Sequence, residues 1–374
     1  MVMRRRERRL QDIIAKVRGK TFEYEPREKA KTNWRNYDAA QCHEIVAVLE
    51  FIRELVNTAE ERVAAKKISK PTEGRPSGRP PEIPASDVAK VLLMQTYFGA
   101  ANRVAEGLEI LFSDRLGLRT EFSYKTIERG YDDSEVIGLL DEVRVLTNEP
   151  VQELEKIFSV DGTGHSTSSK QNYESDRSKQ REERGSKEPG DDTFPKASRP
   201  YVATSAIIGF KYKLYASWSC TTDPRVGERS LFDGVFDDAI DIHPNMTLIT
   251  GDGSYANRPT CKKVGSAGVR PVFLPASNVT MKKKGVGGWV HMLASLADAP
   301  QEYLRDYHQR SISETGFSMD ERAFPAPIRK RLRRRKETAS SMRFLCHNVK
   351  RLAYLKFLCN EVQLTFSNRP KIAC

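Results

Sequence analysis

The chain has 374 residues, 39% of them hydrophobic, so it is long enough for two or three domains with a sizeable core. Its 62 Lys and Arg residues outnumber 50 acids and give a net charge of +12, which favours a polyanionic partner, with nucleic acid first and a membrane surface as the alternative. No apolar stretch of transmembrane length and no secretory signal is visible. Six cysteines without a C-x-x-C pair argue against a zinc module or a disulfide framework, and suit reduced thiols in the cytoplasm.

Residues 1–66 predict a basic arm and a helix. The arm, within 1–40, begins with five closely spaced arginines and is typical of a solvated segment that can also touch DNA phosphates. In 41–66 apolar residues recur every three or four positions and predict a helix with one packed face. Residues 67–86 contain five prolines and predict a linker. In this linker Arg79 is a candidate for the DNA minor groove, and a plain spacer is the alternative.

Residues 87–150 predict a small helical domain. A first helix is expected over 87–98 with Ser86 as its cap, a second over 101–112, and a later one from Ser134 to Val145.

A short polar helix after Ser123 completes the pattern of a helix-turn-helix, in which the second helix enters the major groove. Its candidate DNA contacts are Tyr124, Lys125 and Arg129. A helical bundle that does not bind DNA has the same pattern.

Two hydrophobic strands each lead into an aspartate followed by small residues. The strand at 157–160 precedes Asp161, and the strand at 246–250 precedes Asp252. A helix expected from about Gln301 to Met319 carries Glu314. Carboxylates at the ends of adjacent strands can converge, and hard oxygen ligands are what Mg²⁺ requires. The three acids therefore predict a two-metal site for phosphoryl transfer.

The same helix places Tyr307 and Arg310 on the face that carries Glu314, because their offsets are three and four residues. A satisfied ion pair on a buried face is the alternative interpretation.

The segment 151–324 predicts one α/β domain with an RNase H-like mixed sheet flanked by helices. A polar insert at about 166–198 follows the first acid, and a hairpin joins strands at 201–208 and 212–219. A helix, the second acidic strand, a short helix from 255 to 263 and an edge strand at 269–274 complete the order.

Two basic segments follow. Lys283 lies in a lysine- and glycine-rich loop that suits a DNA strand, with a surface turn as the alternative. Residues 325–374 form a basic segment and a closing helix at 341–358. Within 329–336 seven of eight residues are basic, and this density indicates phosphate contacts by Arg333 and Arg334 among others. His347 in the closing helix lacks a partner at metal-ligand spacing.

The motifs Val160-Asp161-Gly162-Thr163, Gly251-Asp252-Gly253-Ser254-Tyr255 and Tyr307-x2-Arg310-x3-Glu314 occur in this order. Over about residues 78–358 the chain resembles the DDE-type insertion-sequence transposases with an RNase H-like core. The third motif looks like that family's Tyr-x2-Arg-x3-Glu-x6-Lys signature. Glu321 stands at the position of the lysine, and Arg322 comes one residue later.

The resemblance implies a recombinase that binds the double-stranded ends of its element, cleaves them with water and joins the freed 3′-hydroxyl to target DNA. Asp161, Asp252 and Glu314 would hold two Mg²⁺ ions, with Mn²⁺ as a substitute. Tyr307 would stack on a displaced base, while Arg310 and Arg322 would contact phosphate. The resemblance also implies a homodimer that pairs two ends, in the cytoplasm and at the nucleoid of a prokaryote.

Two alternatives remain. One is a DNA-binding regulator derived from a transposase and without catalysis, which the missing lysine and the long insert favour. The other is an RNase H-like nuclease that hydrolyses DNA and never joins it.

Overall fold

The structure, a computed structural model, describes residues 2–25, 33–69, 82–168, 201–281, 287–359, 361–364 and 366. Arg79, Lys283 and nearly all of the predicted polar insert lie outside these residues.

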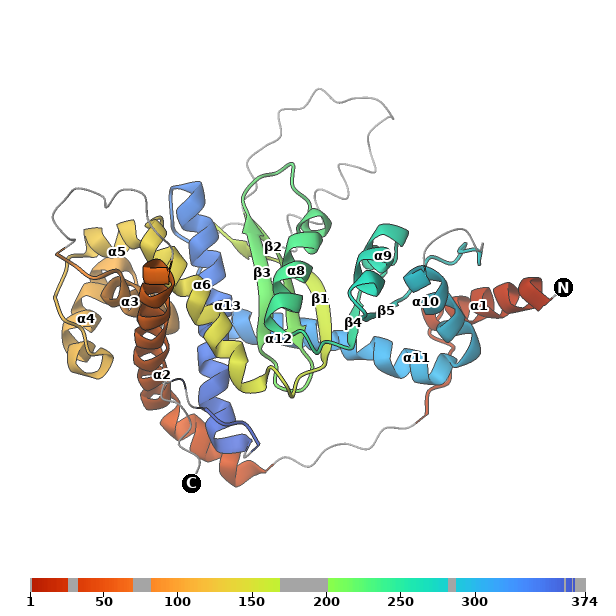
Figure 1. Ribbon diagram of the computed structural model, residues 1–374, viewed down its shortest axis with the longest axis horizontal. Helices are drawn as coiled ribbons and strands as arrows, with labels where there is room; N and C mark the ends of the chain where they lie inside the picture. The colour runs from red at the N-terminus through yellow and green to blue at the C-terminus, as the bar shows by residue number, and fades with distance from the viewer. Residues whose placement is uncertain are drawn as a thin grey trace.

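A five-stranded mixed sheet forms the centre of the molecule (Figure 1). Its spatial order is β3-β2-β1-β4-β5. The β1–β2 and β2–β3 pairs are antiparallel, whereas the β1–β4 and β4–β5 pairs are parallel. The strands are β1 (Ile157–Ser166), β2 (Tyr201–Gly209), β3 (Tyr215–Thr221), β4 (Leu248–Gly251) and β5 (Arg270–Phe273). The predicted hairpin, the predicted strand order and the edge position of the last strand are confirmed, and the sheet is consistent with an RNase H-like fold.

Helices cover both faces of this sheet (Figure 1). The predicted helix after the hairpin is confirmed, and the predicted helix at 255–263 begins later, since Pro259 occupies its first turn and a 3₁₀ turn precedes it. From the hairpin onward the helices are α8 (Phe232–Ile242), α9 (Arg258–Ser266), α10 (Gly287–Asp298), α11 (Pro300–Tyr307), α12 (Ser311–Ala323) and α13 (Arg333–Leu358).

The helix predicted from Gln301 to Met319 is interrupted. The 3₁₀ turn η4 (His308–Arg310) separates α11 from α12. Tyr307, Arg310 and Ser311 keep right-handed helical dihedral angles, so the chain continues in nearly the same direction through the turn.

The N-terminal helices are longer than predicted. They are α1 (Val2–Arg18), α2 (Trp34–Ser69), α3 (Ala85–Phe98), α4 (Asn102–Leu116), α5 (Tyr124–Gly130) and α6 (Ser134–Asn148). Asp133 caps α6 by accepting from two backbone N–H groups, as expected for that position. The predicted cap at Ser86 is wrong, because α3 begins one residue earlier and the Ser86 hydroxyl donates to Glu60.

Two hydrophobic cores lie on the two faces of the sheet. Alternation along β1 sends Phe158 and Val160 into the core formed with α8 to α11, while Ser159 faces α12. The other core joins α2, α3, α5, α6 and α13 to Ala206 and Tyr215 of the sheet. The predicted helical region and one face of the predicted catalytic domain therefore share one core.

The charged N-terminal segment is a docked helix, so the prediction of a solvated arm is wrong. Leu10, Ile13 and Ile14 of α1 are almost completely buried in the core that contains α10. Figure 1 shows α1 beside α10, at the opposite side of the sheet from α2 to α5. Spacings of three and four residues put these side chains on one face, and Arg5, Arg8 and Arg9 are exposed elsewhere on the helix surface.

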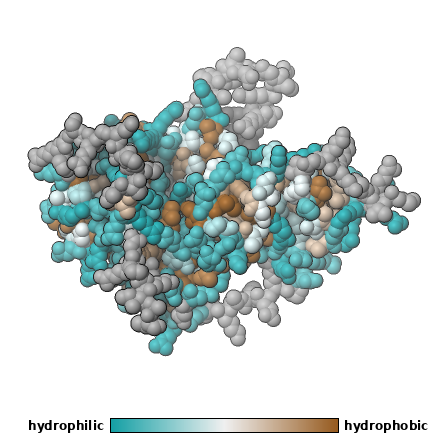
Figure 2. Space-filling view, in the orientation of Figure 1, coloured by the Kyte–Doolittle hydropathy of each residue, from teal (hydrophilic) through white to brown (hydrophobic). Residues whose placement is uncertain are grey.

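The surface is largely hydrophilic in the view of Figure 2, with hydrophobic residues concentrated near the middle, over the sheet. Across the described ranges, every helix is too short or too polar to cross a bilayer.

Candidate active site

Hydrogen bonds attach the turn η4 and its flanking residue Tyr307 to the two strands that lead into the aspartates. From β1, the Ser159 hydroxyl donates to the Arg310 carbonyl oxygen at 3.3 Å. From β4, the Thr250 hydroxyl donates to the Tyr307 carbonyl oxygen at 3.2 Å. Ser313 of α12 adds a hydrogen bond of 2.7 Å to the Ser159 hydroxyl. Buried hydroxyls on the strands thus fix the segment that carries Tyr307, Arg310 and Glu314.

Asp161 and Asp252 follow directly after a parallel pair of residues. Val160 of β1 lies opposite Gly251 of β4, and neighbouring strands lie about 4.8 Å apart. A Cβ atom at Gly251 would lie 2.9 Å from Val160 Cγ1, so only glycine lets the strands meet in this way. The predicted juxtaposition of the two aspartates is present, although Asp161 itself still pairs with Ala206 of β2.

Each aspartate carboxylate accepts from the backbone that follows it. Asp161 Oδ1 accepts from the Gly162 N–H at 2.8 Å. Asp252 Oδ1 accepts from the Ser254 N–H at 2.8 Å and from the Ser254 hydroxyl. These bonds fix the Asp161 carboxylate within β1 and the Asp252 carboxylate just after the end of β4, and they leave Oδ2 of each for other partners.

Arg310 joins the third acid to this pair. Its Nη1 donates to Glu314 Oε1 at 3.1 Å, and its guanidinium lies 5.6 Å from the centre of the Tyr307 ring. Burial opposes the charge of Arg310, but Tyr307, Glu314 and both aspartates outweigh it and raise the pKa of the guanidinium. We call Asp161, Asp252, Glu314 and Arg310 the carboxylate cluster.

The negative charge of this cluster is only partly balanced. The pKa of Asp161 is raised to about 6, mainly by burial and also by the charges of Asp252 and Glu314, which outweigh the lowering effects of the Gly162 N–H and Arg310. Three carboxylates share one guanidinium in this place. A carboxyl whose ionised form is disfavoured by like charges is suited to bind a cation.

The donor set fits a hard divalent cation, since it offers only carboxylate oxygens. Among the residues that the structure describes, no three His, Cys, Asp or Glu side chains are grouped closely enough to hold a metal ion. Glu314 instead binds Arg310 at 3.1 Å, and its side chain is 59% exposed.

Tyr307 has a different position from the one predicted. Its side chain is 6% exposed and belongs to the core that contains β4 and α11. In this conformation the ring cannot stack on a displaced base. It packs against Arg310 and thereby positions the guanidinium.

Sequence reasoning missed Glu228, in the 3₁₀ turn η2 (Glu228–Leu231). Its carboxylate lies over Gly162, where any Cβ atom would collide with it. Together with Asp161 and Asp252 it raises the pKa of the buried Tyr255, after the larger effect of burial. No sequence motif marks Glu228, which lies in a polar loop 67 residues after Asp161 and 24 residues before Asp252. Only the lack of a side chain at position 162 indicates it.

The predicted groove-facing residues of the helical region are exposed. Lys125 and Arg129 project from α5, and Tyr124 lies half-buried with Arg103 5.3 Å from its ring centre. The α3, α4 and α5 helices pack on one another, as a helix-turn-helix requires.

The basic run 329–336 has two parts. Arg333 and Arg334 are exposed at the start of α13. Lys330 and Arg335 are instead bound to Glu128 of α5 at 2.7 and 3.2 Å. α13 begins eight residues earlier than predicted because these ion pairs stabilise cations at a helix N-terminus, where the dipole disfavours them.

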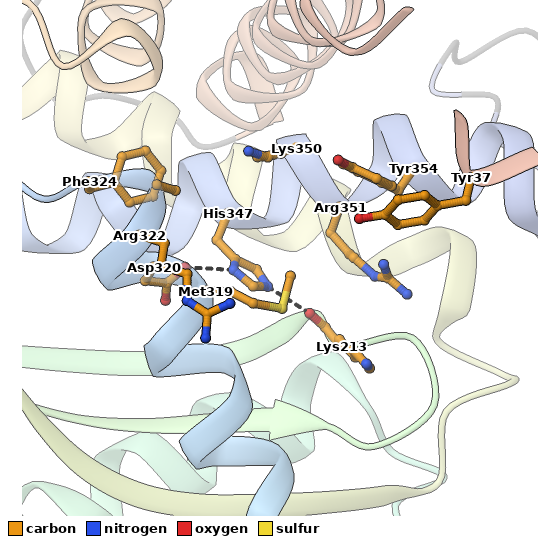
Figure 3. A pocket seen from close by; sticks show the side chains of 11 residues that line it. Tyr37, Lys213, Met319, Asp320, Arg322, Phe324, His347, Lys350, Arg351 and Tyr354 are labelled. Carbon is orange, nitrogen blue, oxygen red and sulfur yellow. Dashed lines mark hydrogen bonds and ion pairs between the residues drawn. The ribbon is translucent and has the colours of Figure 1, made fainter. Parts of the chain in front are cut away.

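Arg322 does not join the carboxylates. It lies in the last turn of α12, about 12 Å along the helix axis from Glu314. Its guanidinium donates to Ser318 and lines a separate cavity beside His347 (Figure 3).

The chain is similar to a known protein over most of its length. The chain is 26% identical over 349 residues to a protein from Archaeoglobus fulgidus described as a probable transposase for insertion sequence element ISA1214. The match covers 91% of this chain and 94% of that relative. No family model and no solved structure matches the chain. The resemblance to insertion-sequence transposases is confirmed by this similarity along nearly the full length of both proteins.

Proposed function

We propose that the chain is a transposase that cuts the ends of its insertion sequence and joins the freed 3′-hydroxyls to target DNA. One observation carries this proposal. Hydrogen bonds from Ser159 and Thr250 attach the segment from Tyr307 to Glu314 to the two strands that contain or lead into Asp161 and Asp252. Similarity to a probable transposase over almost the whole chain supports it.

Asp161 and Asp252 would hold two Mg²⁺ ions, or Mn²⁺ in their place, and Glu314 would complete the ligand set. Bound metal ions of this kind supply a hydroxide or alkoxide nucleophile and stabilise the leaving oxygen. Asp161 would bind metal in its ionised form, which the positive charge of Arg310 favours. Arg310 would then exchange Glu314 for a phosphate oxygen of the DNA, because its planar guanidinium suits both anions.

The exposed cations of α5 and α13 would contact the phosphates of the double-stranded element ends. Lys125 and Arg129 lie on α5, and Arg333 and Arg334 lie at the start of α13. Glu128 joins these two elements through Lys330 and Arg335, so they would act as one surface. We further propose a homodimer that pairs two ends, at the nucleoid of a prokaryotic cell.

One observation favours a second function. The signature of the resembled family has a lysine where this chain has Glu321. Arg322, the basic residue next to that position in the sequence, lines a separate cavity away from the carboxylates. A DNA-binding regulator that derives from a transposase and lacks catalysis would tolerate this change.

The test is metal-dependent cleavage of the DNA that flanks this gene. Wild type is compared with Asp252→Asn, which keeps an acceptor for the Ser254 N–H, and with Asp237→Asn, which removes an exposed carboxylate on α8. We expect discrete cuts in Mg²⁺ that Asp252→Asn reduces at least about a hundredfold, since a lost ligand costs several kcal/mol of transition-state stabilisation. Asp237→Asn should cut like wild type.

The remaining outcomes separate the alternatives. End binding without cutting by the wild type would support the regulator. Cutting without strand transfer from a pre-cut end would support a nuclease. Equal cutting by Asp252→Asn and wild type would refute the carboxylate site.

A further inference from the structure

A cavity of about 430 Å³ opens where α2, the β2–β3 hairpin, the end of α12 and α13 meet (Figure 3). Its volume is in the range of small-ligand sites. The side chains of Lys213, Arg322 and Arg351 line it, together with Tyr37 and Tyr354. We call this the basic cavity.

The acids near this cavity are already committed to other groups. Asp320 binds His347 Nδ1 at 2.6 Å and accepts from the Tyr215 hydroxyl at 2.7 Å. The other His347 nitrogen, Nε2, lies 2.9 Å from the Lys213 carbonyl oxygen. Glu44 binds Lys350, a fourth cation of the lining, at 3.2 Å. Within the described residues, Lys213, Arg322 and Arg351 have no carboxylate partner.

The fold holds Lys213 and Arg351 together against their repulsion. Burial lowers the pKa of Lys213, and the charge of Arg351 lowers it further. Arg351 is fixed by donation from Nε to the Tyr212 carbonyl oxygen at 2.9 Å. Lys213 itself has a φ of 60°, a left-handed conformation that a lysine rarely adopts. An anion between these side chains would remove the repulsion that the hairpin and α13 maintain.

Aromatic rings extend from the cavity to the surface. Gln41 donates to the hydroxyl of Tyr354 at 2.8 Å and to that of Tyr37 at 3.1 Å, and the two rings lie 6.2 Å apart. Trp34 packs edge-on against Tyr37 and is 67% exposed. Cations beside a row of aromatic faces are the combination by which proteins bind single-stranded nucleic acid.

We propose that the basic cavity binds a backbone phosphate of single-stranded DNA, with neighbouring bases stacked on Tyr37 and Trp34. The ligand class rests on the proposed function, in which cleavage frees a strand end. Glu314 and Arg322 share α12, so a strand that leaves the carboxylate cluster needs to extend only about 12 Å along this helix to reach the cavity.

The first test is protection of lysines from chemical acetylation, measured by mass spectrometry on the full chain in EDTA. Lys213 faces the cavity, whereas Lys211, two residues away, is exposed and paired with Glu361. A short oligothymidylate should slow modification of Lys213 at least about tenfold and leave Lys211 nearly unchanged, since one charged hydrogen bond to phosphate accounts for such a factor. Without divalent metal no cleavage occurs, so this result is independent of the catalytic proposal.

Each other outcome overturns the proposal. Equal protection of both lysines would indicate non-specific coating of the chain. Protection of Lys213 by inorganic phosphate at the same concentration would indicate an anion site that does not recognise a strand. No protection, or protection by duplex as strong as by the single strand, would also refute it.

A second measurement uses the tryptophans. Of the three in the chain, Trp218 and Trp289 are each 8% exposed, so Trp34 is the one that a bound base can quench. Arg351→Gln should weaken quenching by the oligothymidylate at least about tenfold and lower its salt dependence by about 0.7, the value for one phosphate contact in a single strand. Lys356→Gln removes a cation from the same helix outside the cavity and should bind like wild type. Equal affinities for the two variants would contradict the proposal.

Discussion

Helix α12 carries two clusters of opposite charge, one near each end. Glu314 in its first turn belongs to the carboxylate cluster, and Arg322 in its last turn belongs to the basic cavity. The helix dipole favours this arrangement, with the acid at the positive end and the cation at the negative end. Dipole energies are at most about 2 kcal/mol and do not explain why three acids, or three cations, gather around each end.

The two clusters differ in what leaves their charge unbalanced. In the carboxylate cluster, one arginine lies among three acids and the negative charge stays in excess. In the basic cavity, the available acids are bound by His347 and Lys350, and the positive charge stays in excess. Folding normally pairs charges that it buries even in part, so the excess charge on Asp161 and on Lys213 with Arg351 supports the ligands of opposite sign proposed above. A cation and a phosphate are the two components that strand transfer requires.

The largest effect is expected at Asp320, the acid that supports the wall of the basic cavity. Asp320→Asn should lower the free energy of unfolding by about 3 kcal/mol, because it removes one partner of a buried ion pair and leaves His347 incompletely bonded. Urea denaturation at neutral pH measures the change. Glu321→Gln, at the exposed next residue, should alter stability by less than about 0.5 kcal/mol. Equal stability of the two variants would mean that the cavity wall does not depend on this pair.

The second effect concerns the excess charge of the carboxylate cluster. The pKa of Asp161 is raised from 3.8 to about 6 in the folded chain, so the folded state binds this proton more tightly than the unfolded state. Stability without metal should therefore be highest below about pH 4 and fall as the pH rises to about 6. The shift corresponds to about 3 kcal/mol at 1.36 kcal/mol per pKa unit, and solvent screening of this partly exposed carboxylate reduces it. Asp161→Asn should remove this loss and stabilise the chain by about 2 kcal/mol above pH 6.

Denaturation in EDTA at pH 4 and pH 7.5 would measure this difference. The two proteins should have similar stability at the lower pH. Glu314→Gln changes an exposed acid of the same cluster, and it should change the free energy of unfolding at pH 7.5 by less than about 1 kcal/mol. A destabilised Asp161→Asn at pH 7.5 would show that the carboxylate cluster carries no excess of negative charge.

Local patterns predicted the sheet and the position of the two aspartates. The alternating and apolar runs around Asp161 and Asp252 specify strands, and their parallel pairing places the two aspartates side by side. The predicted strand end at Asp161 is wrong, because pairing with β2 extends β1 for five more residues. The interruption between α11 and α12 was not predictable, because the helical spacing of Tyr307, Arg310 and Glu314 continues through the 3₁₀ turn. The hydroxyls that fix this turn, Ser159 and Thr250, are distant in sequence.

Three features were not predicted from the sequence, because each depends on residues that are distant along the chain. The docked helix α1 was not predicted because its many arginines are typical of a solvated segment. Its buried face consists of Leu10, Ile13 and Ile14. The early start of α13 depends on Glu128, some 200 positions away. Four different segments contribute to the basic cavity through Tyr37, Lys213, Arg322 and Arg351. Any two of these residues are at least 29 positions apart in the sequence, so no local pattern indicates the cavity.

The smallest effect would show whether the two clusters are electrically independent. Arg310 lowers the pKa of Asp161, so Arg310→Gln should raise that pKa further. Protons compete with metal for a carboxylate. The pH at which Mg²⁺ begins to stabilise the chain should therefore move upward by about 0.5 unit in Arg310→Gln, a shift of roughly 0.7 kcal/mol. Thermal unfolding with and without Mg²⁺ between pH 5 and 8 measures this midpoint.

Arg322→Gln removes the same charge from the other cluster, about 12 Å along α12 from Glu314, where solvent and salt screen it. It should leave the midpoint unchanged, and an equal shift in both variants would mean that α12 carries one continuous field and not two separate sites.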